Sequence, residues 1–240
     1  MVMIAYPRNW HIVGNPIQTQ ELKSAIIDTI IGCKCNHLSL SGGIDSSLLL
    51  HYMSENYPIV NAYTIGLSEN HPDVEFSRLA ASRYKNVRHL VYIPTQSEIT
   101  KHTYDGDYMG DCNVRMLYNF ISEYTDCVIA GDGIDEYTCG YYKHISEPSE
   151  SVYYDFIRRL YSEQLEPLNK NSGNVKVLLP YLSHKLIYLL SQIPLSLKTD
   201  CGLRKALMVK LAILANIPEP IISRRKYGLC DAGKIKGTIC

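Results

Sequence analysis

The stretch Ser41-Gly42-Gly43-Ile44-Asp45-Ser46-Ser47 follows the apolar run Leu38–Leu40 and precedes the helix-like run Leu48–Met53. This order predicts a strand, a tight glycine turn and the start of a helix. Such a turn directs free backbone N–H groups and the positive end of a helix dipole toward one point, which favours a phosphate or pyrophosphate group. The glycines allow the backbone to approach an anion closely, and the serine hydroxyls can donate further hydrogen bonds.

Asp45 is the exception in this loop, because a carboxylate repels a phosphate group unless a divalent cation lies between them. The loop therefore predicts a site for the phosphates of a nucleotide together with Mg²⁺. A capped helix after an ordinary turn is the alternative, since the same residue types make turns and caps. The lysine-containing GxxxxGK[ST] spacing of P-loop NTPases is absent, whereas the string matches the pattern SGGxDS.

The composition limits the classes of protein to consider. The 240 residues include 24 Lys and Arg and 24 Asp and Glu, so no net charge favours nucleic acid or an acidic membrane surface. No apolar stretch is long enough to span a bilayer, and the first residues do not form a secretion signal. The eight cysteines include no C-x-x-C pair, which favours reduced thiols over a zinc site or a disulfide framework. We therefore expect a cytoplasmic protein.

Strands and helices alternate along the first part of the chain. Strands are predicted at 37–40, 59–65, 87–93 and 126–130, and helices at 18–31, 46–55, 72–84 and 114–124. This alternation indicates a parallel α/β sheet with right-handed crossovers and with ligands at the carboxyl ends of the strands. After Gly140 one strand is indicated at 175–179, and helices are predicted at 149–168, 184–191 and 203–215. We expect an α/β core over residues 1–145 and a helical portion over residues 146–240 that packs on the same domain.

A second group of carboxylates follows the fourth predicted strand. The segment there is Gly131-Asp132-Gly133-Ile134-Asp135-Glu136, and it continues to Gly140-Tyr141-Tyr142. Because the carboxyl ends of parallel strands meet at one edge of a sheet, these carboxylates are expected beside the phosphate loop. One carboxylate from each loop could then share a Mg²⁺ ion that holds and polarises a triphosphate. A solvated acidic turn is the alternative.

Together these segments resemble the synthetase domain of the asparagine synthetase family, which belongs to the ATP pyrophosphatases with an SGGxDS loop. Residues 131–141 resemble its GEGSDE-x-x-GGY motif, a form that NAD and GMP synthetases do not carry. Three further segments resemble V-P-F-L-D, L-R-x-A-L and R-x-K-x-G-F; they are Leu179-Pro180-Tyr181-Leu182, Leu203-Arg204-Lys205-Ala206-Leu207 and Arg224-Arg225-Lys226-Tyr227-Gly228-Leu229. The resemblance extends over most of the chain, and five ordered motifs are far more specific than one.

The resemblance implies a set of site residues. Those implied to bind ATP are Leu40, Ser41, Gly42, Gly43, Asp45, Ser46, Ile65, Gly131 and Asp132. Asp45 and Asp135 are implied to coordinate Mg²⁺, as the matching aspartates do in the related β-lactam synthetase. Lys226 is implied to stabilise the charge that develops on the leaving pyrophosphate. Tyr142 is the candidate base for the second step, since a tyrosine–glutamate pair serves this purpose in β-lactam synthetase, although no glutamate partner is evident from the sequence.

The departures from the family pattern concern the substrate. Alignment on Pro180 places Lys176 where asparagine synthetases have a glutamate proposed to assist amine attack, and Leu178 where they have arginine. A lysine cannot act as the same base without a lowered pKa, and it would attract a different substrate charge. An alignment slip of one residue along an exposed strand is the alternative. Cys139 replaces the first glycine of the GG pair, so a change in that turn is expected.

The predicted function is an ATP-dependent amide-forming ligase of the asparagine synthetase type. It would adenylate aspartate or another carboxylic acid with release of pyrophosphate, and an amine or ammonia would then displace AMP. The glutaminase domain of asparagine synthetases is not expected, because Val2 stands where their nucleophilic cysteine follows the initiator methionine. Free ammonia, an amine substrate or a separate glutaminase subunit would supply the nitrogen. The alternatives are an ATP pyrophosphatase that modifies a nucleotide or tRNA base, and a non-catalytic ATP-binding subunit.

Overall fold

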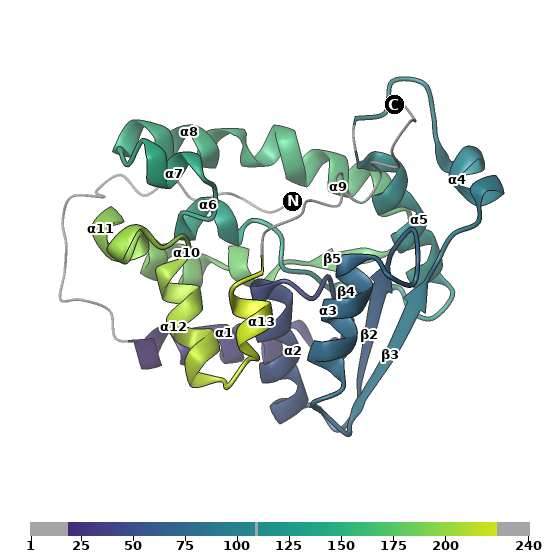
Figure 1. Cartoon of the computed structure of the whole chain (residues 1–240), viewed down its shortest axis with the longest axis horizontal. Coiled ribbons are helices and arrows are strands. Elements are labelled where there is room, and N and C mark those ends of the chain that lie inside the picture. Colours follow the sequence, from purple (N-terminus) through teal and green to yellow (C-terminus); the bar gives the residue numbers. More distant parts are fainter. Residues whose placement is uncertain (1–18, 109, 225–240) are drawn as a thin grey trace.

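The computed structural model describes residues 19–108 and 110–224, and its centre is a five-stranded parallel sheet (Figure 1). The strands are β1 (His37–Ser39), β2 (Val60–Ile65), β3 (Val87–Tyr92), β4 (Cys127–Ile129) and β5 (Lys176–Leu178). Their order is β3-β2-β1-β4-β5, and Leu38 of β1 aligns with both Ala62 and Ile129. The predicted parallel α/β sheet is confirmed, including the strand after Gly140.

Helices cover both faces of this sheet (Figure 1). α2 (Ile44–Asn56) and α3 (Pro72–Ala81) pack on one face, α1 (Thr19–Cys33) packs on α2, and α5 (Asp111–Ser122) packs on the other face. The side chains of β2 show this division. Val60 and Ala62 belong to the buried cluster around α2, whereas Tyr63 and Ile65 belong to the cluster around α5. Because successive side chains of a strand point to opposite faces, a strand covered on both sides buries nearly all of its residues, as β2 does except for the half-buried Asn61.

The connections leave β1 and β4 in opposite directions. β1 leads through α2 to its neighbour β2 and then to β3. The chain returns through α4 (Gln96–His102) and α5 to β4, on the other side of β1, and β4 leads on to β5, which lies away from β1. In open α/β sheets, neighbouring strands whose connections diverge leave a crevice at their carboxyl ends, where ligands bind. The loops that border this crevice are the two motifs identified in the sequence, after β1 and after β4.

The remaining helices follow β4 in the chain and pack partly on α1 and α2. They are α6 (Ile134–Thr138), α7 (Lys143–Ser146), α8 (Glu150–Leu160), α9 (Glu166–Asn171), α10 (His184–Ser191), α11 (Leu195–Lys198), α12 (Ala206–Leu214) and α13 (Glu219–Ile222). Among the described residues, no helix has the length and apolar character that crossing a membrane requires. One hydrophobic cluster includes Leu38 of β1, Leu49 of α2 and Leu211 of α12, so these helices share the core of the sheet. The division at residue 145 stays a prediction.

Two predicted helices differ from the structure. The helix predicted over 149–168 is interrupted by a π-helical segment (Tyr161–Leu165), in which the Glu166 N–H bonds to the Tyr161 carbonyl. Pro167 accounts for the wider turn, because proline lacks an N–H and its ring collides with the carbonyl four residues earlier in a regular helix. The helix predicted over 203–215 begins only at Ala206, since Lys205 has left-handed backbone angles (φ 55°, ψ 37°). The short helices α4, α6, α7, α11 and α13 are additional to those predicted.

Gly42 allows the first loop to approach α3. Its φ is +70°, and a Cβ atom placed on it would lie 2.3 Å from the Ser77 backbone nitrogen. We expect Gly42→Ala to lower the free energy of unfolding by about 2 kcal/mol, because a side chain is opposed both by the left-handed conformation and by the neighbouring backbone. Urea unfolding followed by circular dichroism measures the change.

Gly32→Ala is the matched control, because Gly32 lies in α1 and no atom stands within 4 Å of its Cβ position. Removal of a helical glycine should leave the free energy of unfolding unchanged or raise it by up to about 1 kcal/mol. Equal stability of Gly42→Ala and the wild-type protein would contradict the close approach of this loop to α3.

Candidate functional site

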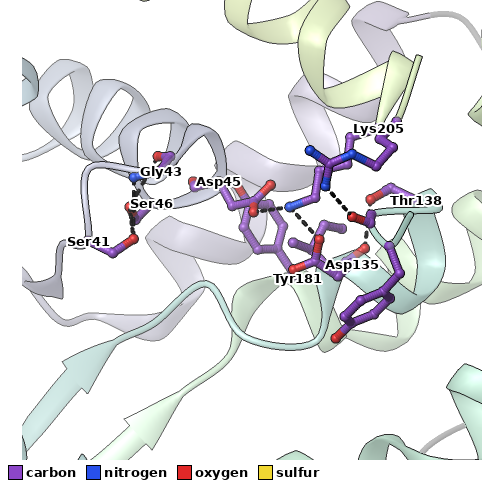
Figure 2. A network of polar contacts seen from close by, with 12 residues as sticks. Ser41, Gly43, Asp45, Ser46, Asp135, Thr138, Tyr181 and Lys205 are labelled. Carbon is purple, nitrogen blue, oxygen red and sulfur yellow. Dashed lines mark hydrogen bonds and ion pairs between the residues drawn. The ribbon is translucent and has the colours of Figure 1, made fainter. Parts of the chain in front are cut away.

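The loops after β1 and β4 form a single site. A Cβ atom on Gly131, two residues after the end of β4, would stand 3.6 Å from Asp45 Cβ and 3.7 Å from the Ser46 nitrogen. Asp45 lies in the first turn of α2, and Asp135 lies in the first turn of α6. Figure 2 shows both carboxylates directed toward the ammonium group of Lys205. The structure therefore brings together the two aspartates that the sequence predicts as metal ligands.

The first loop is held by hydrogen bonds among its own polar groups. The Ser41 and Ser46 hydroxyls are 3.2 Å apart, and the Gly43 N–H donates to Ser41 Oγ at 3.3 Å. Ser46 Oγ donates to the Gly43 carbonyl at 3.2 Å, and the Tyr181 hydroxyl donates to the Asp45 carbonyl at 2.9 Å. The loop leads directly into α2, and the first N–H groups of a helix have no acceptor within it. Serine hydroxyls beside a helix N-terminus are suitable donors for an anion.

Lys205 is the central cation of the site. Its Nζ contacts Asp45 Oδ2 and lies 2.6 Å from Asp135 Oδ1, and its side chain is only 8 % exposed. Burial lowers the pKa of a lysine, but the charges of Asp135 and Asp45 outweigh burial here and raise the pKa of Lys205. The amine is therefore an ammonium ion at neutral pH. Removing one member of such a buried group costs more than its net contribution, because the other charges stay buried.

Gly140 makes room for this arrangement. A Cβ atom on Gly140 would lie 1.7 Å from Asp135 Oδ1 and 2.6 Å from Lys205 Cε. The preceding residue, Cys139, has left-handed backbone angles (φ 61°, ψ 51°), which glycine adopts without strain. The turn thus has the geometry typical of glycine, although cysteine stands at this position. Any further side chain here would push the carboxylate or the ammonium out of place.

A cavity of about 130 Å³ opens beside the loop. Three cationic side chains border it, those of Arg204, Lys205 and Arg224, together with the carboxylates of Asp45 and Asp73. Its apolar wall consists of Ile44, Val209, Ile221 and Ile222. Cationic side chains next to a helix N-terminus offer hydrogen-bond donors and charge to a phosphate chain.

Arg224 joins the last described residues to the phosphate loop. Its guanidinium donates to the Ser41 carbonyl at 2.8 Å, pairs with the Asp73 carboxylate and lies 4.7 Å from the centre of the Phe76 ring. Burial raises the pKa of Asp73 against the opposing charge of Arg224. Arg224 begins the segment that resembles R-x-K-x-G-F, so this ion pair brings the start of the motif to the loop. Lys226, the predicted catalytic residue, lies outside the described residues.

The two tyrosines after the second loop have different surroundings. Tyr142 is exposed, and the Arg204 guanidinium stacks 3.9 Å from the centre of its ring. The Tyr141 hydroxyl donates to Glu136 Oε1 at 2.6 Å. The side-chain amide of Gln164, in the π-helical segment, donates to the same Glu136 oxygen and to the Tyr141 hydroxyl oxygen. Burial and the Glu136 charge raise the pKa of Tyr141. The tyrosine–glutamate pair that the sequence does not reveal thus involves Tyr141 rather than Tyr142.

Three of the predicted nucleotide contacts lie at the margin of the site. Leu40 and Ile65 are buried in the core, and the Leu40 carbonyl accepts a hydrogen bond from Thr64 Oγ1 at 2.5 Å. Their side chains therefore pack the sheet, and only the backbone near them faces the carboxyl edge. Asp132 is exposed, and its charge adds to burial in raising the pKa of Tyr118 on α5. Asp132 accordingly lies toward α5 rather than in the ammonium-centred group.

Lys176 lies at the amino-terminal end of its strand, whereas the two loops follow the carboxyl ends of β1 and β4. It is exposed at the start of β5 and aligns with Cys127, the first residue of β4. Burial and Cys127 raise the pKa of the Cys33 thiol at the end of α1, whereas the charge of Lys176 lowers it. Because this charge acts on Cys33, Lys176 lies near this end of α1. Leu178 is partly buried against the main core. Lys176 is thus separated from the crevice, and it gives no structural reason to favour a non-catalytic subunit.

The two aspartates fit the requirements of Mg²⁺. Among the described residues, no group of three or more His, Cys, Asp and Glu side chains could hold a metal ion. Mg²⁺ does not need such a group, because it usually keeps several waters and binds one or two carboxylates together with substrate phosphates. The oxygens of Asp45 and Asp135 already surround one cation, the Lys205 ammonium. These carboxylates would hold Mg²⁺, which when bound supplies charge neutralisation for a triphosphate.

Three residues of the site are not predicted from the sequence, namely Lys205, Arg204 and Asp73. Lys205 stands at the variable position of L-R-x-A-L, so the motif gives no reason to expect a functional residue there. Asp73 follows Pro72 at the start of a helix, where an acidic residue is an ordinary helix-start signal. The one available signal is the pair of adjacent cations directly before the apolar run of α12, and a solvated pair of this kind is common.

Comparisons with known proteins agree with this geometry. A family model described as asparagine synthase matches residues 37–177, which run from β1 into β5 and include both loops. No curated protein shows a significant match to the chain. Among solved structures, that of NMN synthetase from Francisella tularensis matches with a TM-score of 0.50 and 14 % sequence identity. The match covers 91 % of this chain and 77 % of that chain, and at this identity it concerns the fold alone.

His144 links the pH of the solution to the stability of the second loop. It is buried, and the Tyr141 N–H donates to its Nδ1 at 3.3 Å, which requires a neutral ring. Burial lowers the pKa of His144 to about 4. Because the unfolded chain binds this proton near pH ~6.5, the free energy of unfolding should fall between about pH 6.5 and pH 4, by up to about 1.4 kcal/mol per pH unit from this histidine.

His144→Asn keeps an acceptor for the Tyr141 N–H but cannot titrate, so its free energy of unfolding should decline less steeply over this interval. Urea unfolding at a series of pH values measures both slopes. His184→Asn, at an exposed position of α10, is the control for the loss of a histidine. Parallel pH profiles for His144→Asn and the wild-type protein would exclude this contribution.

Proposed function

Because the chain belongs to the asparagine synthase family, we propose that it is an ATP-dependent ligase that forms an amide through an acyl-adenylate. The observation that supports this function best is the meeting of the serine–glycine loop with the Asp45 and Asp135 carboxylates at one crevice. The loop and the start of α2 supply donors for phosphate, and the carboxylates supply ligands for Mg²⁺. ATP is the proposed nucleotide, and Mg²⁺ is the proposed metal.

The proposed reaction has two steps. An oxygen of the substrate carboxylate attacks the α-phosphorus of ATP, the bond from this phosphorus to the bridging oxygen breaks, and pyrophosphate leaves. An amine nitrogen then attacks the acyl carbon, the bond to AMP breaks, and the nitrogen releases a proton. The chain contributes mainly position and charge: the Ser41 and Ser46 hydroxyls would donate to the pyrophosphate, and Arg204 and Arg224 border the cavity that would receive it.

The second step needs a group that accepts a proton from the amine. Tyr142 is the candidate from the sequence, and its exposed ring beside Arg204 leaves its hydroxyl open to a substrate. Tyr141 is a second candidate, because its hydrogen bond to Glu136 offers a route by which the proton could pass to a carboxylate. Its raised pKa means that it would act together with Glu136 and not as a free tyrosinate.

The two substrates are proposed by chemical class. The acceptor is a small carboxylic acid, aspartate or another, and the nitrogen comes from ammonia, an amine or a separate glutaminase subunit. A chain with equal numbers of acidic and basic residues offers no general attraction for nucleic acid, which speaks against a tRNA substrate. The cytoplasm, where ATP and amino acids are available, is the proposed location.

A pyrophosphate-exchange assay tests adenylation directly. The protein, ATP, Mg²⁺ and labelled pyrophosphate are incubated with aspartate and with a panel of other carboxylic acids. We expect label to enter ATP only with the acceptor acid, and Asp45→Asn to lower this exchange at least about a hundredfold, because it removes a carboxylate that binds the metal. Asp28→Asn is the matched control, since Asp28 pairs with Lys185 at the surface.

The outcomes of this assay separate the three functions. Exchange that depends on one acid would establish the ligase and name its acceptor. ATP binding without exchange for any acid would favour the non-catalytic subunit. Exchange or pyrophosphate release that requires a tRNA or nucleotide would favour the base-modifying ATP pyrophosphatase.

Two variants assign the predicted catalytic residues to separate steps. Lys226→Met should lower the rate of exchange at least about a hundredfold with little change in the KM of the acid, because the lysine would act on charge that develops as pyrophosphate leaves. Tyr142→Phe should leave exchange intact and slow only amine-dependent AMP release. Lys234→Met is the control for the loss of a lysine near the carboxyl terminus. Normal exchange in Lys226→Met would remove this residue from the mechanism.

A further inference from the structure

We propose that Lys205 is an exchangeable counter-ion, which occupies the metal position in the nucleotide-free protein and gives up both aspartates when a divalent cation binds. This inference rests on the proposed function, since it concerns the same Asp45 and Asp135 carboxylates. In the structure the Lys205 Nζ contacts Asp45 Oδ2 and lies 2.6 Å from Asp135 Oδ1 (Figure 2).

Only one cation can occupy this position at a time. Both contacts end on one nitrogen atom, so the ammonium lies between the two carboxylate oxygens. A Mg²⁺ ion shared by the same oxygens would stand about 2.0–2.1 Å from each of them, and would therefore lie within a few ångströms of the ammonium. Repulsion between the two positive charges at such a short distance would also exclude joint occupancy. Binding of the metal therefore requires the lysine to move.

Lys205 has a place to move to. Its side chain also borders the cavity beside the phosphate loop, and a lysine has a flexible four-carbon stem. Gly140 closes the other side, since a Cβ atom there would lie 2.6 Å from Lys205 Cε. The neighbouring Arg204 has its own partners, because its guanidinium donates to the Gly140 carbonyl at 2.9 Å and stacks on the Tyr142 ring. The displaced ammonium would therefore enter the cavity, where nucleotide phosphates would be its new partners.

The exchange would couple the binding of metal to the binding of nucleotide. Metal alone must displace an ammonium ion that makes two charge-assisted contacts, and it offers the lysine no new partner. When the metal binds together with a triphosphate, the released ammonium exchanges its two carboxylate contacts for contacts with the phosphates. Such coupling is reciprocal, so each ligand should strengthen the binding of the other.

Mn²⁺ binding without nucleotide tests this exchange, because the EPR signal of free Mn²⁺ shows how much of the ion is bound. We expect Lys205→Met to bind Mn²⁺ at least about tenfold more tightly than the wild-type protein, equivalent to about 1.4 kcal/mol, since the competing ammonium is gone. Lys205→Gln keeps donor groups without the charge, and it serves as a second variant if the methionine variant does not fold. Lys210→Met, on α12 and in an exposed ion pair with Asp200, should bind Mn²⁺ as the wild type does.

A second readout is thermal unfolding, in which Mn²⁺ should raise the Tm of Lys205→Met more than that of the wild type. With a non-hydrolysable ATP analogue present, the difference in Mn²⁺ affinity should become smaller. Unchanged Mn²⁺ affinity in both Lys205 variants would overturn the exchange. Mn²⁺ binding by Asp45→Asn in the presence of the analogue separates failure of the proposed function from failure of the exchange. Undiminished Mn²⁺ binding by this variant would refute the metal site of the proposed function. Lost Mn²⁺ binding in Asp45→Asn with wild-type affinity in the Lys205 variants would refute only the exchange.

Discussion

The contact of one buried ammonium with two carboxylates holds together the three segments that form the site. Asp45 belongs to the start of α2, Asp135 to the start of α6, and Lys205 directly precedes α12. Two carboxylates facing one crevice repel each other, so a cation between them is needed for the loops to approach. The absence of a side chain at Gly140 leaves room for this contact, and Lys205 makes it from a left-handed backbone conformation.

A second buried lysine shows how strongly the partners decide the state of an amine. The Lys198 side chain is fully buried, and its Nζ donates to the Tyr153 hydroxyl at 2.6 Å. Burial lowers the pKa of Lys198 to about 7, whereas the pKa of the similarly buried Lys205 is raised. The difference comes from the carboxylates around Lys205, because an opposite charge at contact distance outweighs desolvation. Burial alone would therefore have left the amine only partly charged near neutral pH.

The sheet explains why the chemistry gathers at one edge. β1 and β4 are neighbours whose connections diverge, and each strand ends in a glycine loop that starts a helix. Helix dipoles and free N–H groups consequently point into the crevice between them. Lys176 is the first residue of β5 and therefore lies at the amino-terminal ends of the parallel strands, away from the crevice at their carboxyl ends. A residue that alignment places in the site can thus be excluded from it by its position along a parallel strand.

The sequence by itself determined the parallel α/β sheet, its fifth strand and the two loops, because hydrophobic period and glycine-turn chemistry act over a few residues. It also predicted that a carboxylate from each loop would meet, since strand ends in such a sheet share an edge, and the family resemblance singled out Asp45 and Asp135. Only the tertiary structure decided that Lys205, 160 residues after Asp45, lies between them, and that Arg224, 151 residues after Asp73, reaches the loop. It also decided that Glu136 pairs with Tyr141. These contacts depend on how distant helices pack and on single backbone angles, and no local pattern of residue types encodes either of them.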